Sequence, residues 1–278
     1  MSIITFWNKR KEQNGKTLSA VALATYTAIQ HNYRILLIST SLNDRTMQKC
    51  YWKERRTTSG LFGPNIGNSG IQNGIEGLNR IVKSNKVSPE LITNYTRVVF
   101  KDRLEVLLGY TGNKNDFKTI ASNYMEIIKL ADKYYDMVII DLDKEIGEEC
   151  EKNILSNSDI IVATMSQRLE SINEFVDARK KMEEIQGKII IPLITRYDNN
   201  SKYNVKNVSR NLLGQKDIMN SIPYNTFFFE SAEEAGMVDF FLRMRNLKEN
   251  DYNYFFINEI KQLSENVNIA IGELHSKK

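Results

Sequence analysis

Short apolar segments alternate with longer amphipathic segments along most of this chain. Each apolar segment is rich in Ile, Val and Leu and is nearly continuous, which is typical of strands buried on both faces of a parallel sheet. Strands are therefore predicted at residues 3–6, 34–39, 104–108, 137–141, 160–164 and 189–195.

The segments between these strands are long enough for crossover helices. Residues 116–133 carry apolar side chains at helical spacing, and residues 169–185 form a second amphipathic segment. Alternating strands and helices indicate an α/β fold with right-handed crossovers. We predict three layers: a mostly parallel central sheet of at least six strands, with helices on both faces.

Residues 42–103 follow a different pattern. They show no long strand, many polar residues and a cluster of glycines. Helices are expected near 71–84 and after Ser88, which would act as N-cap with Pro89 at the first helical position. We interpret this region as a helical insertion within one domain that spans residues 1–278; a flexible loop is an equally good interpretation of 57–70.

The end of the chain, residues 251–278, is expected to form a C-terminal helix. Its apolar residues at 256, 260, 263, 267, 270, 271 and 274 fall on one helical face. Packing against the domain is the favoured interpretation, ahead of a partner helix. A membrane-surface helix is the least favoured, because Lys and Arg do not dominate the polar face.

Composition narrows the class of protein only slightly. Of the 278 residues, 41% are hydrophobic and 26% charged, as in globular proteins. The net charge of +4 permits contact with DNA or an anionic membrane but requires neither. Cys50 and Cys150 are expected to be free thiols rather than a disulfide. The sequence shows no signal-peptide pattern and no apolar segment long enough for a membrane span, so we expect a cytoplasmic protein.

A Gly15-Lys16-Thr17 sequence stands between the first predicted strand and an Ala-rich helical segment at 17–29. A strand, Gly-Lys-Thr and a helix in this order are typical of a phosphate-binding loop. The free N–H groups and the dipole at the start of such a helix favour binding of phosphate. The Lys16 side chain would reach the β- and γ-phosphates, and the Thr17 hydroxyl would hold Mg²⁺. Binding of ATP or ADP is assigned to Gln13, Asn14, Gly15, Lys16, Thr17 and Leu18.

Asp141 ends the predicted strand at 137–141. Ligands of open α/β sheets bind at the carboxyl ends of the strands, so Asp141 and Lys16 should converge on one edge. A carboxylate in this place can hold Mg²⁺ together with Thr17. The alternative is that Asp141 caps the next turn.

Residues 11–17 resemble the deviant Walker A loop, KGGxGKT, of the ParA/MinD family of SIMIBI-class P-loop ATPases. Its additional lysine, five residues before the phosphate-loop lysine, is Lys11 here. Residues 135–141 resemble the family strand YDxVIID, residues 158–164 resemble a second family strand, and residues 222–224 resemble an Ile-Pro-Tyr turn near the adenine pocket. The likeness runs from residue 2 to about 245 and is weakest in 42–100; residues 104–109, 196–198 and 201–204 look closer to the TadZ/CpaE branch.

The resemblance implies a P-loop NTPase fold and a homodimer that encloses ATP and Mg²⁺. It implies that Lys11 reaches the phosphates of the partner subunit as an electrostatic clamp. Arg196 and Pro223 are assigned to nucleotide binding on the same ground. Without the resemblance, Lys11 is equally a solvated residue or a general attraction for anions.

Several residues depart from the family pattern. Glu12-Gln13 replaces Gly-Gly, which removes residues suited to positive φ and puts a negative charge near the anion. Ser41 aligns with an aspartate that orients the attacking water, and a serine replaces it poorly. Asp44 is a candidate to replace that aspartate, and the candidate catalytic residues are therefore Lys11, Lys16 and Asp44. Asp44 also fits as the N-cap of a helix at 45–51.

These features favour an ATP-dependent, dimerising switch ATPase that positions or partitions a cargo. The cargo is DNA, a pilus or secretion apparatus, or a cell pole. The departures keep a second function open: an ATP-binding scaffold with little or no hydrolysis, in pilus localisation or a similar assembly. A small-molecule transferase on the same fold is a third hypothesis, and non-specific DNA binding is a separate question.

Overall fold

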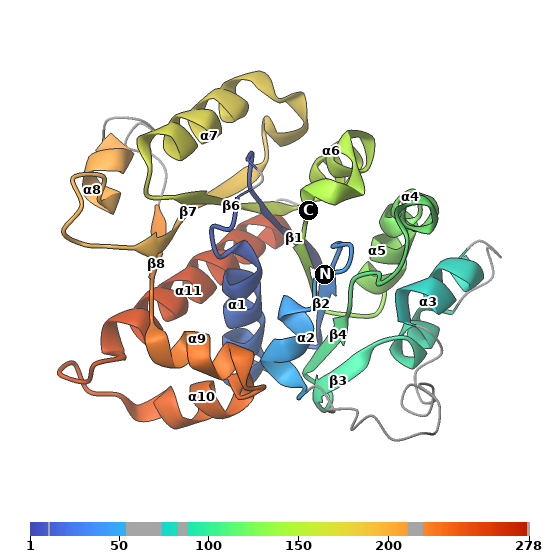
Figure 1. The fold of residues 1–278 in the computed structure, drawn as a ribbon, viewed down its shortest axis with the longest axis horizontal. Coiled ribbons are helices and arrows are strands. Elements are labelled where there is room, and N and C mark those ends of the chain that lie inside the picture. The colour runs from blue at the N-terminus through green and yellow to red at the C-terminus, as the bar shows by residue number, and fades with distance from the viewer. Residues whose placement is uncertain (11, 54–73, 83–87, 211–218, 277–278) are drawn as a thin grey trace, which may run out of the picture.

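The computed structural model describes residues 1–10, 12–53, 74–82, 88–210 and 219–276, and Figure 1 shows their arrangement. The described strands are β1 (Ser2–Trp7), β2 (Ile35–Ser39), β3 (Arg97–Phe100), β4 (Leu104–Leu107), β5 (Met137–Asp141), β6 (Ile160–Ser166), β7 (Ile189–Tyr197) and β8 (Asn220–Pro223). The described helices are α1 (Lys16–Gln30), α2 (Thr46–Tyr51), α3 (Gly74–Val82), α4 (Lys114–Ala121), α5 (Tyr124–Asp132), α6 (Glu148–Asn157), α7 (Leu169–Lys181), α8 (Val205–Val208), α9 (Thr226–Glu233), α10 (Met237–Arg243) and α11 (Tyr254–Ser276).

The strands form one sheet in the order β3-β4-β2-β5-β1-β6-β7-β8. Only the β3–β4 pair is antiparallel among the described strands. Asp141 at the end of β5 lies in register with Phe6 of β1 on one side and Ser39 of β2 on the other. The carboxyl ends of β1, β2 and β5 therefore meet at one edge of the sheet.

Helices cover both faces of this sheet, as Figure 1 shows. Side chains of α3, α4, α5, α6 and α7 form one apolar core with one face. Side chains of α1, α2, α9, α10 and α11 form the other. Leu36 and Ile38 of β2 belong to the first core, and Ile35 and Leu37 to the second. A strand buried on both faces needs a continuous apolar run, so the predicted three-layer α/β fold is confirmed.

Three elements differ from the prediction: one helix, and the strands β3 and β8 at the two edges of the sheet. The predicted helix at 116–133 is two helices, α4 and α5, separated at Asn123. The Asn123 side chain donates to the carbonyl of Thr119 at 2.9 Å and to Asn79 at 2.8 Å, and such polar side chains compete with the helical hydrogen bonds. Strand β8 was not predicted, because it is short and half polar, and residues 222–223 of the expected turn end it.

The region 42–103 contains α2, α3, a 3₁₀ helix at Pro89–Asn94 and β3. The predicted helix near 71–84 is α3 in its described part, and the turn after Ser88 is a 3₁₀ helix rather than an α-helix. The region is not wholly helical, since β3 adds an antiparallel edge strand. Residues 57–70, where a loop was an equal alternative, lie outside the described residues.

Helix α11 packs on the domain as predicted. The side chains of Phe256, Ile260, Leu263 and Val267 are buried in the core that includes α1. The hydroxyls of Thr27 and Ser264 lie 3.0 Å apart between the two helices. Across the described residues, no helix combines the length and the apolar character that a membrane crossing requires.

The two cysteines are both free, as predicted. Cys50 is a buried residue of α2, and this burial raises the pKa of its thiol to about 12. Cys150 on α6 is partly buried, which also raises the pKa of its thiol. Neither sulfur is set up as a nucleophile, because reactive thiols have lowered pKa values.

Candidate functional site

The loop between β1 and α1 carries the Gly-Lys-Thr sequence to the sheet edge. Gly15 is the N-cap of α1 and has φ of 84°, in the left-handed region that favours glycine. Lys16 and Thr17 are the first residues of α1, which confirms the predicted helix after the loop. Among the described loop residues 12–17, Gly15 alone has a positive φ, so Glu12 and Gln13 do not need the conformational freedom of glycine.

Lys16, Thr17 and Asp141 contact one another. The Nζ atom of Lys16 lies 3.3 Å from Asp141 Oδ1 and also donates to the carbonyl oxygen of Leu142. The Thr17 hydroxyl donates to Asp141 Oδ2 at 2.7 Å. Lys16 is 9% exposed and Asp141 is 3% exposed. The predicted convergence of the first loop and the end of β5 is present in the structure.

Residues after β2 and β5 hold this edge together through Thr40. Its hydroxyl donates to the carbonyl of Asp141 at 3.2 Å and accepts from the N–H of Asp143 at 2.8 Å. Asp143 in turn accepts from the N–H of Glu145, so it caps the next turn. The alternative interpretation of Asp141 as that cap is therefore wrong.

The oxygen atoms at this edge fit a magnesium ion. Asp141 Oδ1 is buried and has no hydrogen-bond partner among the described residues apart from its ion pair with Lys16. Asp141 Oδ2 is paired with the Thr17 hydroxyl. A carboxylate and a hydroxyl are oxygen ligands of the kind that Mg²⁺ takes next to phosphates. Thr17 and Asp141 are thus the residues that would hold it.

A cleft of about 640 Å³ opens over α1 and the ends of the strands. The predicted binding residues Gln13, Asn14, Gly15, Lys16, Thr17, Leu18 and Arg196 line it, together with Asp44. Pro223 lies instead in an adjoining pocket, which Gly15, Leu18 and Arg196 share. The structure therefore brings all the described candidate residues to one continuous site.

The adjoining pocket is mostly apolar and lies at the β7–β8 side of α1. Leu18, Pro223, Phe228, Phe229 and Phe256 are among its lining residues. Thr195 also lines this pocket and is buried, and its hydroxyl donates to the carbonyl of Met165 at 3.2 Å. Its volume is about 50 Å³, and its apolar lining is of the kind that contacts ring systems in small-molecule sites.

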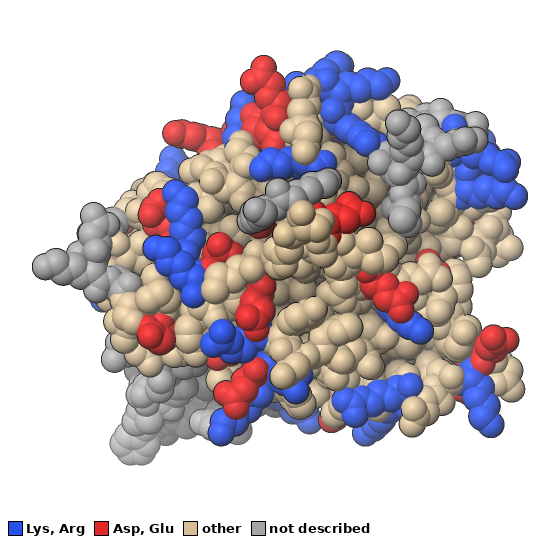
Figure 2. Space-filling model, turned by 180° about the vertical axis from the view of Figure 1, so that it is seen from behind, with Lys and Arg blue, Asp and Glu red and all other residues tan. Residues whose placement is uncertain are grey.

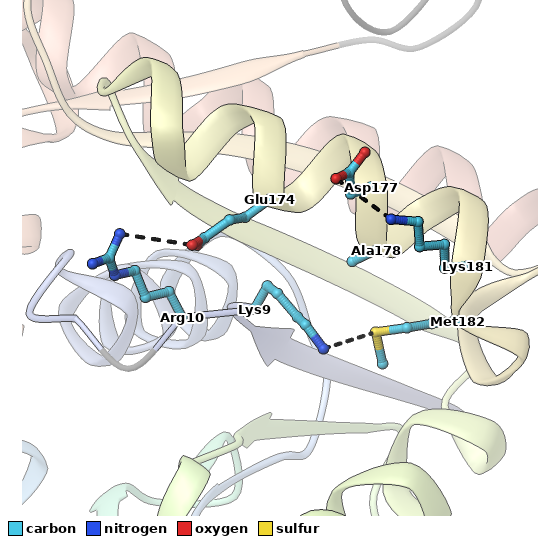
Figure 3. A pocket seen from close by; sticks show the side chains of 7 residues that line it. All are labelled: Lys9, Arg10, Glu174, Asp177, Ala178, Lys181 and Met182. Atoms are coloured by element: carbon cyan, nitrogen blue, oxygen red, sulfur yellow. Dashed lines mark hydrogen bonds and ion pairs between the residues drawn. The ribbon is translucent and has the colours of Figure 1, made fainter.

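The first half of the loop is attached to α7. The Arg10 guanidinium lies 2.6 Å from Glu170 and 3.6 Å from Glu174, and Figure 3 shows Arg10 reaching Glu174 while Lys9 reaches Met182 at 3.7 Å. The Glu12 carboxylate accepts from Ser171 at 2.8 Å and from Ser166 at 3.4 Å.

These contacts modify the expectation about Glu12. Glu12 lines the cleft, but its carboxylate is bound by two hydroxyls instead of standing free beside the anion. Arg10 forms ion pairs with α7. Lys11 lies outside the described residues, so its reach towards a partner subunit stays a prediction.

Asp44 has a structural partner at the start of α2. Its Oδ1 accepts from the N–H of Thr46 at 2.7 Å, but α2 begins at Thr46 with Arg45 as its N-cap, so the cap lies one residue later than predicted. The hydroxyl of Ser41, at the position of the family aspartate, lies 2.8 Å from that of Ser39. Asp44 still lines the cleft, and its part in catalysis stays a prediction.

Sequence reasoning missed Lys144, which also lines the cleft. Its ammonium forms an ion pair with Glu151 and lies 5.2 Å from the centre of the Trp7 ring. Lys144 stands three residues after Asp141, and this closeness to the end of β5 was the sequence signal that it could lie at the site. The contacts with Trp7 and Glu151 join residues that are far apart along the chain, and no local pattern predicts them.

No protein-family model matches the sequence, and no curated protein matches it significantly. Solved structures do match its fold. A ParA family ATPase from Chlorobium tepidum superposes with a TM-score of 0.66 at 14% identity, covering 95% of this chain and 97% of that one. The septum site-determining protein MinD from Pyrococcus horikoshii, complexed with Mg-ADP, has a TM-score of 0.65 at 13% identity, covering 97% and 98%.

A putative plasmid partition protein from Borrelia burgdorferi, bound to AMPPNP, matches with a TM-score of 0.52 at 19% identity. The match covers 98% of both chains. Identities this low establish the fold and leave the activity to be argued from the site. The chain has the ParA/MinD-like P-loop ATPase fold.

Proposed function

We propose that this chain is an ATP-dependent switch ATPase of the ParA/MinD kind, which dimerises around ATP and Mg²⁺ and positions a cargo. One observation carries the proposal. Lys16, Thr17 and Asp141 converge at the N-terminus of α1, beneath a cleft that continues into an apolar pocket. The fold likeness supports it, since two of the similar proteins are described with Mg-ADP and AMPPNP.

The roles of the residues follow from their chemistry. The free N–H groups at the start of α1 and the Lys16 ammonium would bind the phosphates. Lys16 is paired with Asp141 in this structure, so it is held in place before any anion arrives. Mg²⁺ on Thr17 and Asp141 would neutralise charge on the β- and γ-phosphates. Arg196, Leu18 and Pro223 would position the base and sugar.

Dimerisation rests on Lys11 in this proposal. Arg10 and Glu12 on either side of Lys11 are attached to α7 and β6 by ion pairs and hydrogen bonds. Support for the role of Lys11 comes from the sequence: Lys11 stands five residues before Lys16, the spacing of the additional lysine in the family motif.

A second function, a scaffold that binds ATP without turnover, is favoured by a specific observation. Ser41 stands where an aspartate would orient water, and one oxygen of the Asp44 carboxylate accepts from the N–H of Thr46. Phosphate release measured with ATP, Mg²⁺ and each candidate partner separates the two functions. Sustained turnover excludes the scaffold, and nucleotide binding without turnover excludes the ATPase switch.

The nature of the cargo is the least constrained part of the proposal. Figure 2 shows basic and acidic side chains interspersed on the face seen from behind. DNA-binding surfaces usually concentrate Lys and Arg on one face or stripe. The mixed charges favour a protein assembly or a cell pole over DNA as the partner of that face. Electrostatic binding of DNA there would weaken steeply as the salt concentration rises. The resemblance to the TadZ/CpaE branch, and with it a role in pilus localisation, stays part of this proposal.

Replacement of Lys16 tests the nucleotide site. Lys16→Ala should lower the affinity for a fluorescent ATP analogue by about 100-fold, the worth of a strong charged hydrogen bond. Lys129→Ala is the matched control, because Lys129 is exposed on α5 and pairs only locally with Glu126 among the described residues. Equal affinities of wild type and a folded Lys16→Ala variant would show that the site is elsewhere.

A further inference from the structure

Lys144 brings an additional cation to the nucleotide cleft. It begins the short turn Lys144–Ile146 after β5, and it lines the cleft together with Lys16 and Thr17. Its side chain is only 18% exposed and forms an ion pair with Glu151 of α6. The Trp7 indole N–H donates to the same Glu151 oxygen at 2.6 Å. Lys144, Glu151 and Trp7 therefore form one connected cluster.

The electrostatics of this cluster favour an added anion. The pKa of Lys144 is lowered, first by burial and then by the positive charges of Lys9 and Lys16, although the Glu151 carboxylate counteracts both. A lysine in this condition is stabilised by a further negative charge nearby. Two described ammonium groups, those of Lys9 and Lys16, act on Lys144, and the carboxylates paired with Lys16 and Lys144 are Asp141 and Glu151.

The position of Lys144 along the sheet indicates which part of a nucleotide it would meet. The apolar pocket lies at the β7–β8 side of α1, and Lys144 follows β5 on the other side of β1. A nucleotide with its base in that pocket passes the start of α1 before it reaches the end of β5. The group farthest from the base, the γ-phosphate, is then the one beside Lys144.

The Lys144 side chain can change partner while the backbone stays fixed. Its turn is held by Asp143, whose N–H bonds to Thr40 and whose carboxylate caps Glu145. A lysine has a flexible four-carbon chain and a point charge, so it exchanges one anion for another by side-chain rotation. In the described residues the ammonium is bound by Glu151 and lies against the Trp7 ring.

We propose that Lys144 senses the γ-phosphate: it leaves Glu151 for the terminal phosphate when a triphosphate occupies the cleft, and stays on Glu151 when a diphosphate does. This inference rests on the proposed nucleotide function and adds to it the residue that distinguishes ATP from ADP. Glu151 acts as the competing anion, and Trp7 reports the exchange because it shares an oxygen with Lys144 and faces its ammonium.

Affinities for AMPPNP and ADP, both with Mg²⁺, test the inference. Lys144→Met should weaken AMPPNP binding about tenfold, as expected for loss of one charged hydrogen bond, and change ADP binding by less than about threefold. Lys152→Met is the matched control: Lys152 is on α6 and pairs with Glu148 and Glu184 at the surface. Equal loss for both nucleotides overturns the inference alone, whereas failure of the wild type to bind either nucleotide overturns the proposed function and the inference with it.

Fluorescence of Trp7 gives a second test with Lys144 intact. Trp52→Phe leaves Trp7 as the single tryptophan, since the chain contains two. AMPPNP should then change Trp7 emission and ADP should not, and adding Lys144→Met should remove the difference. Identical emission with the two nucleotides, at concentrations where both are bound, would overturn the exchange even if the Lys144→Met variant were unstable.

Discussion

The two halves of the phosphate loop contact different parts of the molecule. The second half, Gly15 to Thr17, faces the sheet edge, where Lys16 and Thr17 contact the buried Asp141. The first half faces α7, where Arg10 and Glu12 contact acidic and hydroxyl side chains. Lys11 matches the family pattern, Glu12 and Gln13 depart from it, and Gly15 to Thr17 keep it. The departure at Glu12 therefore lies where a side chain holds the loop.

This comparison changes the meaning of the missing glycines. Glycine is required where φ is positive or where a side chain would collide. In the described loop only Gly15 meets the first condition. Glu12 uses its side chain as a tether to Ser166 and Ser171, so its departure is compatible with nucleotide binding in the second half.

The largest effect is expected from Asp141→Asn. The change removes the carboxylate that would hold Mg²⁺ and leaves the buried Lys16 without its ion partner. Stability should fall by about 3 kcal/mol, because removal of one member of a buried pair leaves an uncompensated charge. Urea unfolding measures this, and nucleotide affinity should no longer depend on Mg²⁺. An unchanged Mg²⁺ dependence would contradict the role of Asp141.

Glu12 tests the comparison from the other half of the loop. Glu12→Ala should cost about 1 kcal/mol of stability through loss of the Ser171 and Ser166 bonds, while ATP affinity changes by less than about threefold, a difference below 1 kcal/mol. Glu12→Gln is the matched variant, because it removes the charge and keeps a hydrogen-bond acceptor. A tenfold gain in ATP affinity in both variants would show that the Glu12 charge opposes the phosphates and would break the comparison.

Arg10→Ala should have the smallest effect. Both of its ion pairs involve side chains that are more than a third exposed, and such pairs contribute less than about 1 kcal/mol. Melting temperature should fall slightly, and the fall should disappear at high salt, where surface charges are screened. A loss of nucleotide binding in this variant would mean that the first half also forms the phosphate site.

Much of the fold was predictable from local pattern. Strands buried on both faces, such as β2 and β5, require apolar runs that are visible in the sequence, and α1 follows directly from the Gly-Lys-Thr context. The break at Asn123 and the short strands β3 and β8 were missed, because they depend on tertiary contacts that overrule local preference.

The candidate site, like the fold, was predictable where it depends on local sequence. Lys16, Thr17 and Asp141 follow from the rule that ligands bind at the carboxyl ends of parallel strands. The attachment of Glu12 to Ser171 and of Lys144 to Glu151 joins distant segments, so it required the folded chain. Local sequence thus specifies the phosphate-binding half of the site, and the tertiary structure specifies what holds and surrounds it.

The central claim is that the second half of the loop binds nucleotide and the first half presents Lys11 to a partner. Size-exclusion chromatography with light scattering, on wild type and Lys11→Ala with AMPPNP and Mg²⁺, tests it most directly. Wild type should change from the 32.2 kDa of one chain to twice that mass only with nucleotide. Lys11→Ala should stay at the mass of one chain while still binding AMPPNP. A wild type that keeps the mass of one chain with nucleotide bound, or a Lys11→Ala variant that dimerises as wild type does, would contradict the account.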